Sequence, residues 1–307
     1  MPQEETPTRP EIRNFGLMLC KNEAPILRDV MRANTRFVKD IYVLDGGDDG
    51  SEAILREFPE VKFYIHEREL FSRRGKFEVL DGVRAFLFEE IKKTAREGDW
   101  VTIMHGDEIF HHDPNEAIVL ASFSQSNTIS WYSAFFFPHK DDWPDWERLK
   151  ALPLEERFLH YAHYGDHGYE EFRQFKIEPG MYYNPAQHSR VVPEGRTLVD
   201  FVAFPVFKHY KVWDLDPAHY DLTEFDPRYG NAAMNAKDKW GSIRYAPREL
   251  KDFFIENFPK FTHCSRFDGS FGPLEASYDQ AKAQIAAMLE PKGVTIDSLR
   301  QYLLGEA

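Results

Sequence analysis

The residues best suited to chemistry lie in Trp100–Asp113 (WVTIMHGDEIFHHD), where an apolar run ends abruptly in His105-Gly106-Asp107-Glu108. The apolar residues predict a buried strand that delivers an imidazole and two carboxylates to its carboxyl end, where open α/β sheets bind ligands. Paired carboxylates at such a place suit Mg²⁺ or Mn²⁺, and these ions usually also take phosphate oxygens of a substrate. Acidic residues also cap the helix that follows a strand, so this stretch alone supports a metal site and a plain cap about equally.

Two earlier stretches repeat the arrangement of an apolar run followed by polar residues. Phe15–Cys20 ends in Lys21-Asn22-Glu23, and Ile41–Leu44 ends in Asp45-Gly46-Gly47-Asp48-Asp49. Helical patterns follow over residues 25–37, 51–58 and 72–96, and further strands are expected over 61–65 and 128–137. Strand, polar strand end and helix in repetition are typical of a parallel sheet. We therefore expect an α/β fold that gathers these polar segments at one edge of its sheet.

Composition narrows the class of protein. The 307 residues are 42% hydrophobic, enough for one large α/β domain with a substantial core. The net charge of -13 argues against non-specific nucleic-acid binding, which needs lysine and arginine. Cys20 and Cys264 have no zinc spacing and form no disulfide scaffold, so we expect Cys20 to be a packed thiol.

No apolar run approaches the roughly 20 residues that span a bilayer, and the polar N-terminal residues do not resemble a signal peptide. The sequence therefore predicts a cytoplasmic protein without a transmembrane segment. Peripheral attachment to a membrane stays open, and the oligomeric state is not predicted.

Together the three strand ends resemble a known family. LCKNE at 19–23, VLDGGDDGS at 43–51 and W-x-x-x-M-H-G-D-E at 100–108 resemble the KNE, D-x-x-S-x-D-G-T and D-A-D-E motifs of family 2 glycosyltransferases. The resemblance covers about residues 12–115 in order, and Arg73-Arg74-Gly75-Lys76 before the long helix also fits the family layout. It implies a GT-A-like, Rossmann-type, mainly parallel sheet flanked by helices, with an acceptor-side insertion and C-terminal helices.

The resemblance implies a hexosyltransferase-type enzyme that moves a sugar from a UDP- or GDP-linked donor to a glycan or other hydroxyl acceptor, with inversion. Asp45 would accept hydrogen bonds from the nucleoside, and Arg73, Arg74 and Lys76 would neutralise the diphosphate. The alternative for the segment around Asp45 is a plain βα turn with an acidic cap. The alternative for Arg73, Arg74 and Lys76 is a solvated start of the following helix. The residues that match the family's donor site are Lys21, Asn22, Glu23, Asp45, Gly46, Asp48, Arg74, Lys76, His105 and Gly106.

The resemblance also implies a divalent metal, Mn²⁺ or Mg²⁺. Asp107 would hold the ion that bridges the donor phosphates, where it stabilises the departing nucleoside diphosphate as a Lewis acid. His105 stands where the family has the first acid of D-A-D-E, and imidazole suits Mn²⁺ better than Mg²⁺. This departure leaves the metal geometry and the metal dependence open. A late histidine near the metal is also expected, with His209 the better candidate and His188 the second.

Inverting transfer needs a base that takes the proton of the acceptor hydroxyl. Asp166, between two glycines on an expected loop, and Glu171, at a strand entrance, are the two candidates. His111 and His112 follow the metal motif closely, and we interpret them as surface residues.

Two other functions remain in view. A noncatalytic nucleotide- or glycan-binding protein of the same fold is favoured by the missing first acid. A nucleotidyltransferase would need a glycine-rich basic loop after the first strand, whereas Cys20–Pro25 has one lysine and no glycine. Hydrolysis or transfer from a panel of nucleotide sugars with Mn²⁺ would discriminate these functions.

The chain is expected to divide into four segments. Residues 1–11 form a flexible tail, 12–138 the nucleotide-sugar-binding α/β half, 139–245 the acceptor-binding half of the same domain, and 246–307 a C-terminal helical segment. The change at 139 rests on the charged and aromatic character of the following residues, which suggests an insertion beside the acceptor. Strands are expected over 172–177 and 202–207, and helices over about 275–290 and 295–304.

Overall fold

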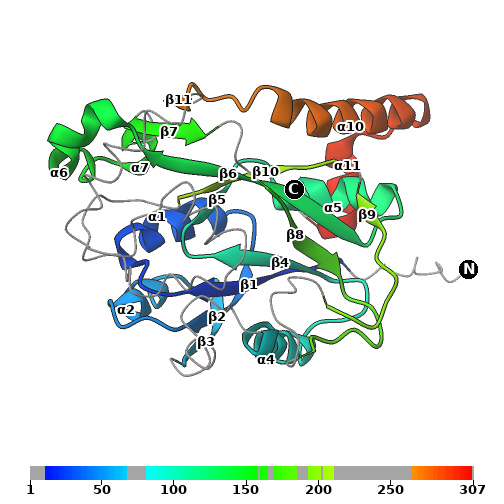
Figure 1. Ribbon diagram of the computed structural model, residues 1–307. Helices are drawn as coiled ribbons and strands as arrows, with labels where there is room; N and C mark the ends of the chain where they lie inside the picture. The colour runs from blue at the N-terminus through cyan, green and yellow to red at the C-terminus, as the bar shows by residue number, and fades with distance from the viewer. Residues whose placement is uncertain are drawn as a thin grey trace, which may run out of the picture.

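The computed structural model describes residues 11–67, 81–157, 160–164, 169–184, 193–201, 203–210 and 264–305. In these ranges the chain is an α/β protein with a mixed, mostly parallel sheet that curls and is flanked by helices (Figure 1). The nine strands of the main sheet are β1 (Asn14–Cys20), β2 (Asp40–Asp45), β3 (Val61–His66), β4 (Trp100–His105), β5 (Glu108–Phe110), β6 (Thr128–Pro138), β8 (Tyr169–Lys176), β9 (Asp200–Phe201) and β10 (Val206–His209).

Four parallel strands in the order β3-β2-β1-β4 form the part of the sheet that carries the polar strand ends. In β1, Leu19 lies opposite Leu44 of β2 and His105 of β4. Such central strands are buried on both faces, so their sequences are continuous apolar runs without alternation. The predicted parallel sheet, and the gathering of its strand ends at one edge, are therefore confirmed.

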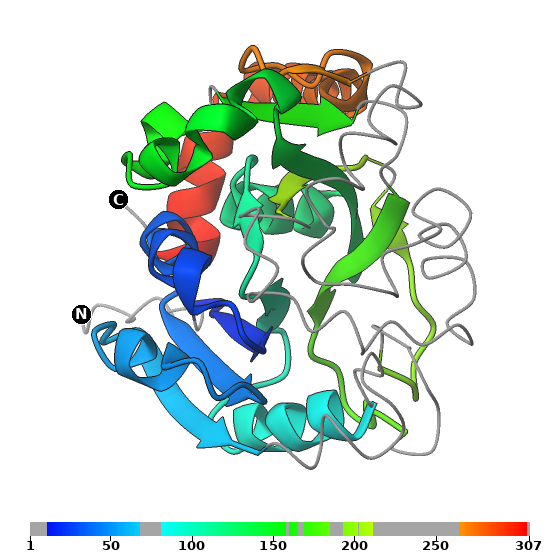
Figure 2. The ribbon, with the colours of Figure 1, turned by 60° about the vertical axis from the view of Figure 1, so that its left-hand side comes forward.

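The sheet continues from β4 through antiparallel β8 to β6, which is also paired with β9 and β10. Strands β7 (Tyr161–Tyr164) and β11 (Cys264–Arg266) extend from the far end of β6. Figure 2 shows the curl, from β3 beside α4 (Asp81–Lys92) round to β7 below α10 (Pro273–Leu289).

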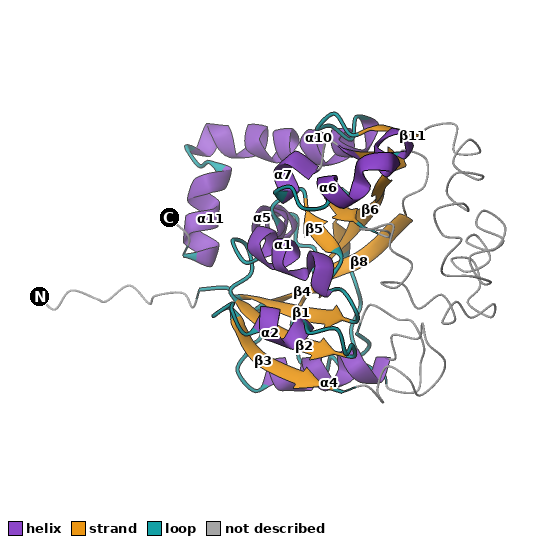
Figure 3. Ribbon diagram, turned by 90° about the vertical axis from the view of Figure 1, so that its left-hand side faces the viewer, coloured by secondary structure: helices purple, strands orange, loops and turns teal. Residues whose placement is uncertain are grey.

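Helices cover both faces of the sheet. One face packs against α1 (Ala24–Asn34), α2 (Ser51–Leu55), α5 (Pro114–Phe123), α10 and α11 (Ile296–Leu304), and these helices share one apolar core with β1, β2 and β4. The opposite face packs against α4, through Val83, Leu87, Phe88 and Ile91. Figure 3 shows α11 descending from the end of α10 to lie beside α5. The short helices η1 (Lys140–Asp145), α6 (Trp146–Leu149) and α7 (Leu154–Arg157) follow β6, and η7 (Glu290–Lys292) follows α10.

The two predicted C-terminal helices are confirmed, and local chemistry explains where the second begins and ends. Thr295 and Ser298 form a capping box, in which each side chain bonds the other residue's backbone N–H, and α11 ends at Gly305 with φ of 64°. Leu303 accepts a 2.8 Å hydrogen bond from the backbone nitrogen of Ile12. The first described residues therefore lie beside the last helix.

Three predicted helices are shorter than their sequence patterns. The predicted helix 25–37 ends at Asn34, whose buried amide donates to the Glu108 carbonyl and accepts from Phe110 N. The predicted helix 51–58 ends at Leu55, after which Glu57 and Phe58 donate to the carbonyls three residues before them, Ile54 and Leu55, and no longer to those four before. The predicted helix 72–96 ends at Lys92, and its predicted start lies outside the described residues.

Two strand predictions needed correction. The predicted strand 202–207 is instead two short strands, β9 and β10, separated by Pro205, which has no N–H to give to a ladder. Strand β8 starts at Tyr169, three residues earlier than predicted. The sequence patterns also missed β5, β7 and β11, each of four residues or fewer.

No helix in the described ranges is long and apolar enough to cross a membrane. Residues 1–10 lie outside those ranges, and the predicted acceptor-side segment 139–245 is described only over 139–157, 160–164, 169–184, 193–201 and 203–210.

Candidate functional site

The ends of β1 and β2 are bonded to each other through their following turns. Asn22 adopts a left-handed backbone with φ of 58°, and its Oδ1 accepts from Asp48 N at 3.2 Å. Asp49 Oδ2 accepts from Ala24 N at 2.6 Å, and its Oδ1 accepts from the backbone and hydroxyl of Ser51. Asp49 therefore holds the starts of both α1 and α2. The N-cap position of α2 is Gly50, so the expected acidic cap is not formed there; Asp48 and Asp49 are both exposed at the surface of the turn.

Asp45 shapes the second turn from inside. It is 2% exposed, and its two oxygens accept from Gly47 N at 2.8 Å and from the Tyr64 hydroxyl at 3.2 Å. Burial raises the pKa of this carboxyl, although both hydrogen bonds oppose the shift. A ligand at this turn would reach Asp48 before Asp45. Gly46 donates its N–H to the Cys20 carbonyl at 3.0 Å, which fixes the turn against β1.

Glu23 lies between the ends of β1 and β4. Its Oε2 accepts from Lys21 N at 3.2 Å, and a Cβ at Gly106 would collide with the same carboxylate. Burial and the neighbouring charge of Asp107 raise the pKa of Glu23 well above its usual range. Cys20, directly beneath, is buried as predicted, and burial raises the pKa of its thiol. A Cβ at Gly106 would also lie 2.9 Å from Cys20 Cβ in the buried strand β1, so Glu23 and Cys20 together leave room only for glycine in the present arrangement.

Asp107 and His209 come together across the sheet. Asp107 lies in the turn between β4 and β5, and His209 ends β10, which pairs antiparallel with β5. The His209 Nε2 and Asp107 Oδ2 atoms are 3.0 Å apart, and Tyr210 N donates to the Asp107 carbonyl at 2.9 Å. The structure thus brings together the residue predicted as the main metal ligand and the late histidine predicted beside it.

Glu108 points into a buried network of charged groups. Its Oε1 accepts from Arg173 Nη2 at 2.6 Å, and it lies 3.1 Å from His105 Nδ1 and 3.6 Å from His209 Nδ1. Burial alone would raise the pKa of Glu108, but the charges of Arg173 and His105 hold it well below its usual range. Arg173, fully buried, also donates to Glu171 Oε2 at 2.7 Å.

Glu171 is therefore bonded to an arginine. Burial opposes ionisation, yet the Arg173 guanidinium lowers the pKa of Glu171 below its usual value. A carboxylate in this state is a weak proton acceptor, because catalysis by a base works best with a pKa near the working pH. Three other predicted residues, Asp166, Arg74 and Lys76, lie outside the described residues, as do Arg73 and His188.

The residues at the end of β4 fit a divalent metal. One ligand atom from each of His105, Asp107 and Glu108 lies within 4.8 Å of the other two. The Nε2 atom of His105 is closed to solvent and has no hydrogen-bond partner in the part of the chain that the structure describes. A buried nitrogen without a partner is costly unless a ligand completes it. Imidazole and carboxylate together suit Mn²⁺ better than Mg²⁺.

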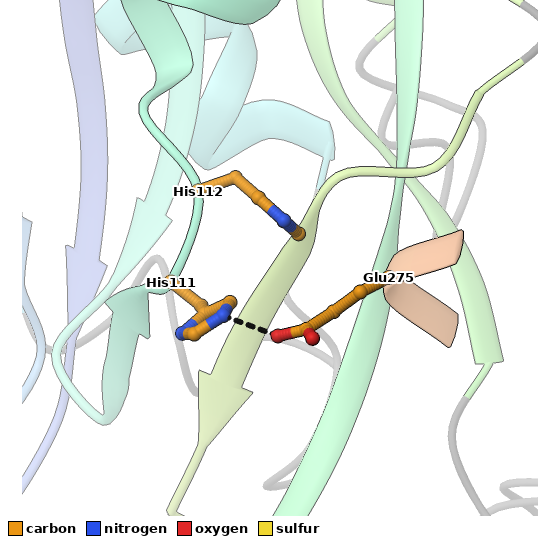
Figure 4. A group of neighbouring side chains, drawn as sticks. All are labelled: His111, His112 and Glu275. Carbon is orange, nitrogen blue, oxygen red and sulfur yellow. Dashed lines mark hydrogen bonds and ion pairs between the residues drawn. The ribbon is translucent and has the colours of Figure 1, made fainter. Parts of the chain in front are cut away.

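A second cluster follows β5 (Figure 4). His111 Nε2 lies 2.6 Å from Glu275 Oε1 on α10, and His112 lies beside both. His112 Nδ1 accepts from Val206 N at 2.7 Å, so its Nε2 carries the proton in the neutral ring. His112 therefore has no lone pair ready for a metal. Both histidines are partly buried, so the interpretation as surface residues was wrong: β10 and α10 pack over them.

Sequence reasoning missed Arg173 and the buried network that it forms. The signal was present, because Arg173 shares one face of the predicted strand 172–177 (FRQFKI) with the apolar residues Phe175 and Ile177. A fully buried arginine is rare without partners, so its position indicated carboxylates nearby. Ser133, whose hydroxyl lies 3.2 Å from His209 Nδ1, gave no such signal.

The comparison with protein-family models found no match, and the comparison with curated protein sequences found none either.

Proposed function

We propose that this chain is a GT-A-like glycosyltransferase of the family 2 type, which moves a sugar from a UDP- or GDP-linked donor to a hydroxyl acceptor. The observation that carries the proposal is the meeting of Glu23, Asp48, His105, Asp107 and His209 at one sheet edge. These residues come from four separate segments. Ligands of open α/β sheets bind at the carboxyl ends of the strands, and all five residues lie at or just after such an end, His209 as the last residue of β10.

The donor would bind across the ends of β1, β2 and β4. The turns after β1 and β2, joined through Asn22 and Asp49, would hold the nucleoside. Asp107 and His209 would hold Mn²⁺ against the diphosphate, where the ion's charge stabilises the leaving group. Arg74 and Lys76 remain proposed diphosphate contacts on sequence grounds alone. The base remains a choice between Asp166 and Glu171, and the ionised pair of Glu171 with Arg173 favours Asp166.

A noncatalytic nucleotide- or glycan-binding protein is the second candidate. It is favoured by the ion pairs of Glu108 and Glu171 with Arg173, because a carboxylate paired with an arginine is a weak base. If Asp166 is no base either, the site would bind a donor without transferring its sugar.

Incubation of the protein with UDP- and GDP-sugars and Mn²⁺ tests the proposal. Release of the nucleoside diphosphate, by hydrolysis or by transfer to an added acceptor, is the expected result. The reaction should be lost in Asp107→Asn. Nucleotide binding without any turnover would favour the second candidate, and absence of both would reject the two together.

A further inference from the structure

We propose that His105 replaces the missing first acid as a ligand of the metal, through Nε2, and that Glu108 and Arg173 are positioning residues that hold it in the required tautomer. This inference rests on the proposed function for the presence of a metal. The resemblance to the family assigns none of these three roles.

The first step is the proton on His105. Glu108 is ionised, since Arg173 bonds its Oε1 at 2.6 Å, and the same oxygen lies 3.1 Å from His105 Nδ1. A carboxylate can only accept, whereas Arg173 Nη1, 3.4 Å from the same Nδ1, can only donate, so the two contacts favour opposite tautomers. We take the Glu108 contact as the bond that forms, because it is the shorter of the two, and so place the proton of the neutral ring on Nδ1. The lone pair is left on Nε2. Metal-binding histidines are commonly fixed in this way, by a carboxylate bonded to their other nitrogen.

The second step is the position of the lone pair. His105 Nε2 is closed to solvent and has no protein partner within the described ranges. A ligand atom of His105 lies within 4.8 Å of one on Asp107. His105 is the last residue of β4, Asp107 lies in the two-residue turn to β5, and both are partly buried, so the sheet fixes both with little ordering cost when an ion arrives.

The third step is the shared carboxylate. Glu108 Oε1 lies 3.6 Å from His209 Nδ1, while His209 Nε2 faces Asp107 at 3.0 Å. The buried carboxylate of Glu108 therefore lies near the Nδ1 atoms of both His105 and His209, the two imidazoles beside Asp107. Arg173 keeps this carboxylate charged, and its second partner, Glu171, has no bond to either imidazole among the described residues.

The test compares Glu108→Gln with Glu171→Gln. Both variants remove one carboxylate from Arg173, but only the first replaces the charged acceptor of His105 Nδ1 with an amide, which is a weaker acceptor and can also turn its NH₂ group to the ring. We expect Mn²⁺ affinity, measured by the loss of the free-ion paramagnetic resonance signal, to fall by about 10- to 100-fold in Glu108→Gln. Glu171→Gln should change it by less than about threefold. His105→Asp should keep binding and shift the preference from Mn²⁺ toward Mg²⁺.

A second measurement needs neither turnover nor a folded variant of Glu108. Nitrogen-15 spectra of histidine-labelled wild-type protein, with the His105 signals assigned by His105→Gln, report which ring nitrogen carries the proton. The proposal expects the proton on Nδ1, and paramagnetic broadening of the His105 ring signals, strongest at Nε2, on adding Mn²⁺. A proton on Nε2, or equal loss of Mn²⁺ affinity in both glutamine variants, would overturn it. Neither experiment depends on sugar transfer, so Mn²⁺ binding through His105 in a protein that transfers no sugar would count against the proposed function and not against this assignment.

Discussion

Replacing Gly106 with alanine would place a methyl group where the Glu23 carboxylate already lies. The added Cβ would collide with Glu23 Oε2 and would lie 2.9 Å from Cys20 Cβ. Cys20 belongs to the buried strand β1 and cannot move without shifting the sheet. Glu23 could rotate away, but it would lose the hydrogen bond from Lys21 N. Either response disturbs the turn that the proposed donor site needs.

The expected cost follows from overpacking a rigid site, roughly 1–3 kcal/mol of the free energy of unfolding. For a domain of this size that corresponds to a lower melting temperature by roughly 2–8 °C. The share that belongs to Glu23 can be isolated, because Glu23→Ala removes one of the two colliding groups. In that background Gly106→Ala should cost less, by roughly 0.5–2 kcal/mol, since residues in contact are not additive.

Urea unfolding of the wild type, the two single variants and the double variant measures this coupling. Additive free energies within about 0.3 kcal/mol would mean that Glu23 does not lie against Gly106. The arrangement of the strand ends described above would then be wrong. A destabilised Gly106→Ala variant whose cost falls by roughly 0.5–2 kcal/mol in the Glu23→Ala background would support the contact between Glu23 and Gly106.

Two further predictions concern charged groups outside the strand ends. Arg157→Met leaves Asp29 without its 2.6 Å partner in a largely buried pair, and it should lower the free energy of unfolding by about 1–3 kcal/mol. Arg28→Met, which breaks an exposed pair with Glu57, should lower it by less than about 1 kcal/mol. Equal losses for the two variants in urea unfolding would contradict this difference between buried and exposed pairs. Burial lowers the pKa of His112 to about 3, so stability should fall as the pH falls from about 6.5 toward 3, by up to about 1.4 kcal/mol per unit from this group. His112→Asn, which keeps an acceptor for Val206 N, should flatten that slope in unfolding series at pH 7, 6 and 5; an unchanged slope would contradict the buried neutral ring.

Much of the fold could be predicted from the sequence because its central strands are buried on both faces. Continuous apolar runs such as Phe15–Cys20 allow few other readings, and the polar residues after each run mark where the strand ends. Helix ends were less predictable. Apolar spacing continues to Phe37, but the chain leaves the helix at Asn34 to bond β5, a contact 74 residues away in sequence.

The candidate site was predictable where position follows from the sheet, and not where it depends on pairing between distant segments. Asp107 and Asp45 were placed correctly at their strand ends, since parallel strands put these ends at one edge. The partner of each charge was not predictable: Glu108 and Arg173 lie 65 residues apart, and nothing local in either segment names the other. The sequence marks His105 only as a departure from the family motif, and the proposal that it is a metal ligand depends on its contact with the Glu108–Arg173 pair.

The most direct test of the central claim is calorimetric titration of UDP and GDP into the wild type and Asp107→Asn, each with and without Mn²⁺. We expect that one nucleotide binds the wild type only with Mn²⁺, and that Asp107→Asn loses this binding while keeping its melting temperature. Asparagine keeps the shape of the side chain but removes the charge that opposes the cation. Metal-dependent binding of equal strength in both proteins, or no binding of either nucleotide to the wild type, would contradict the account.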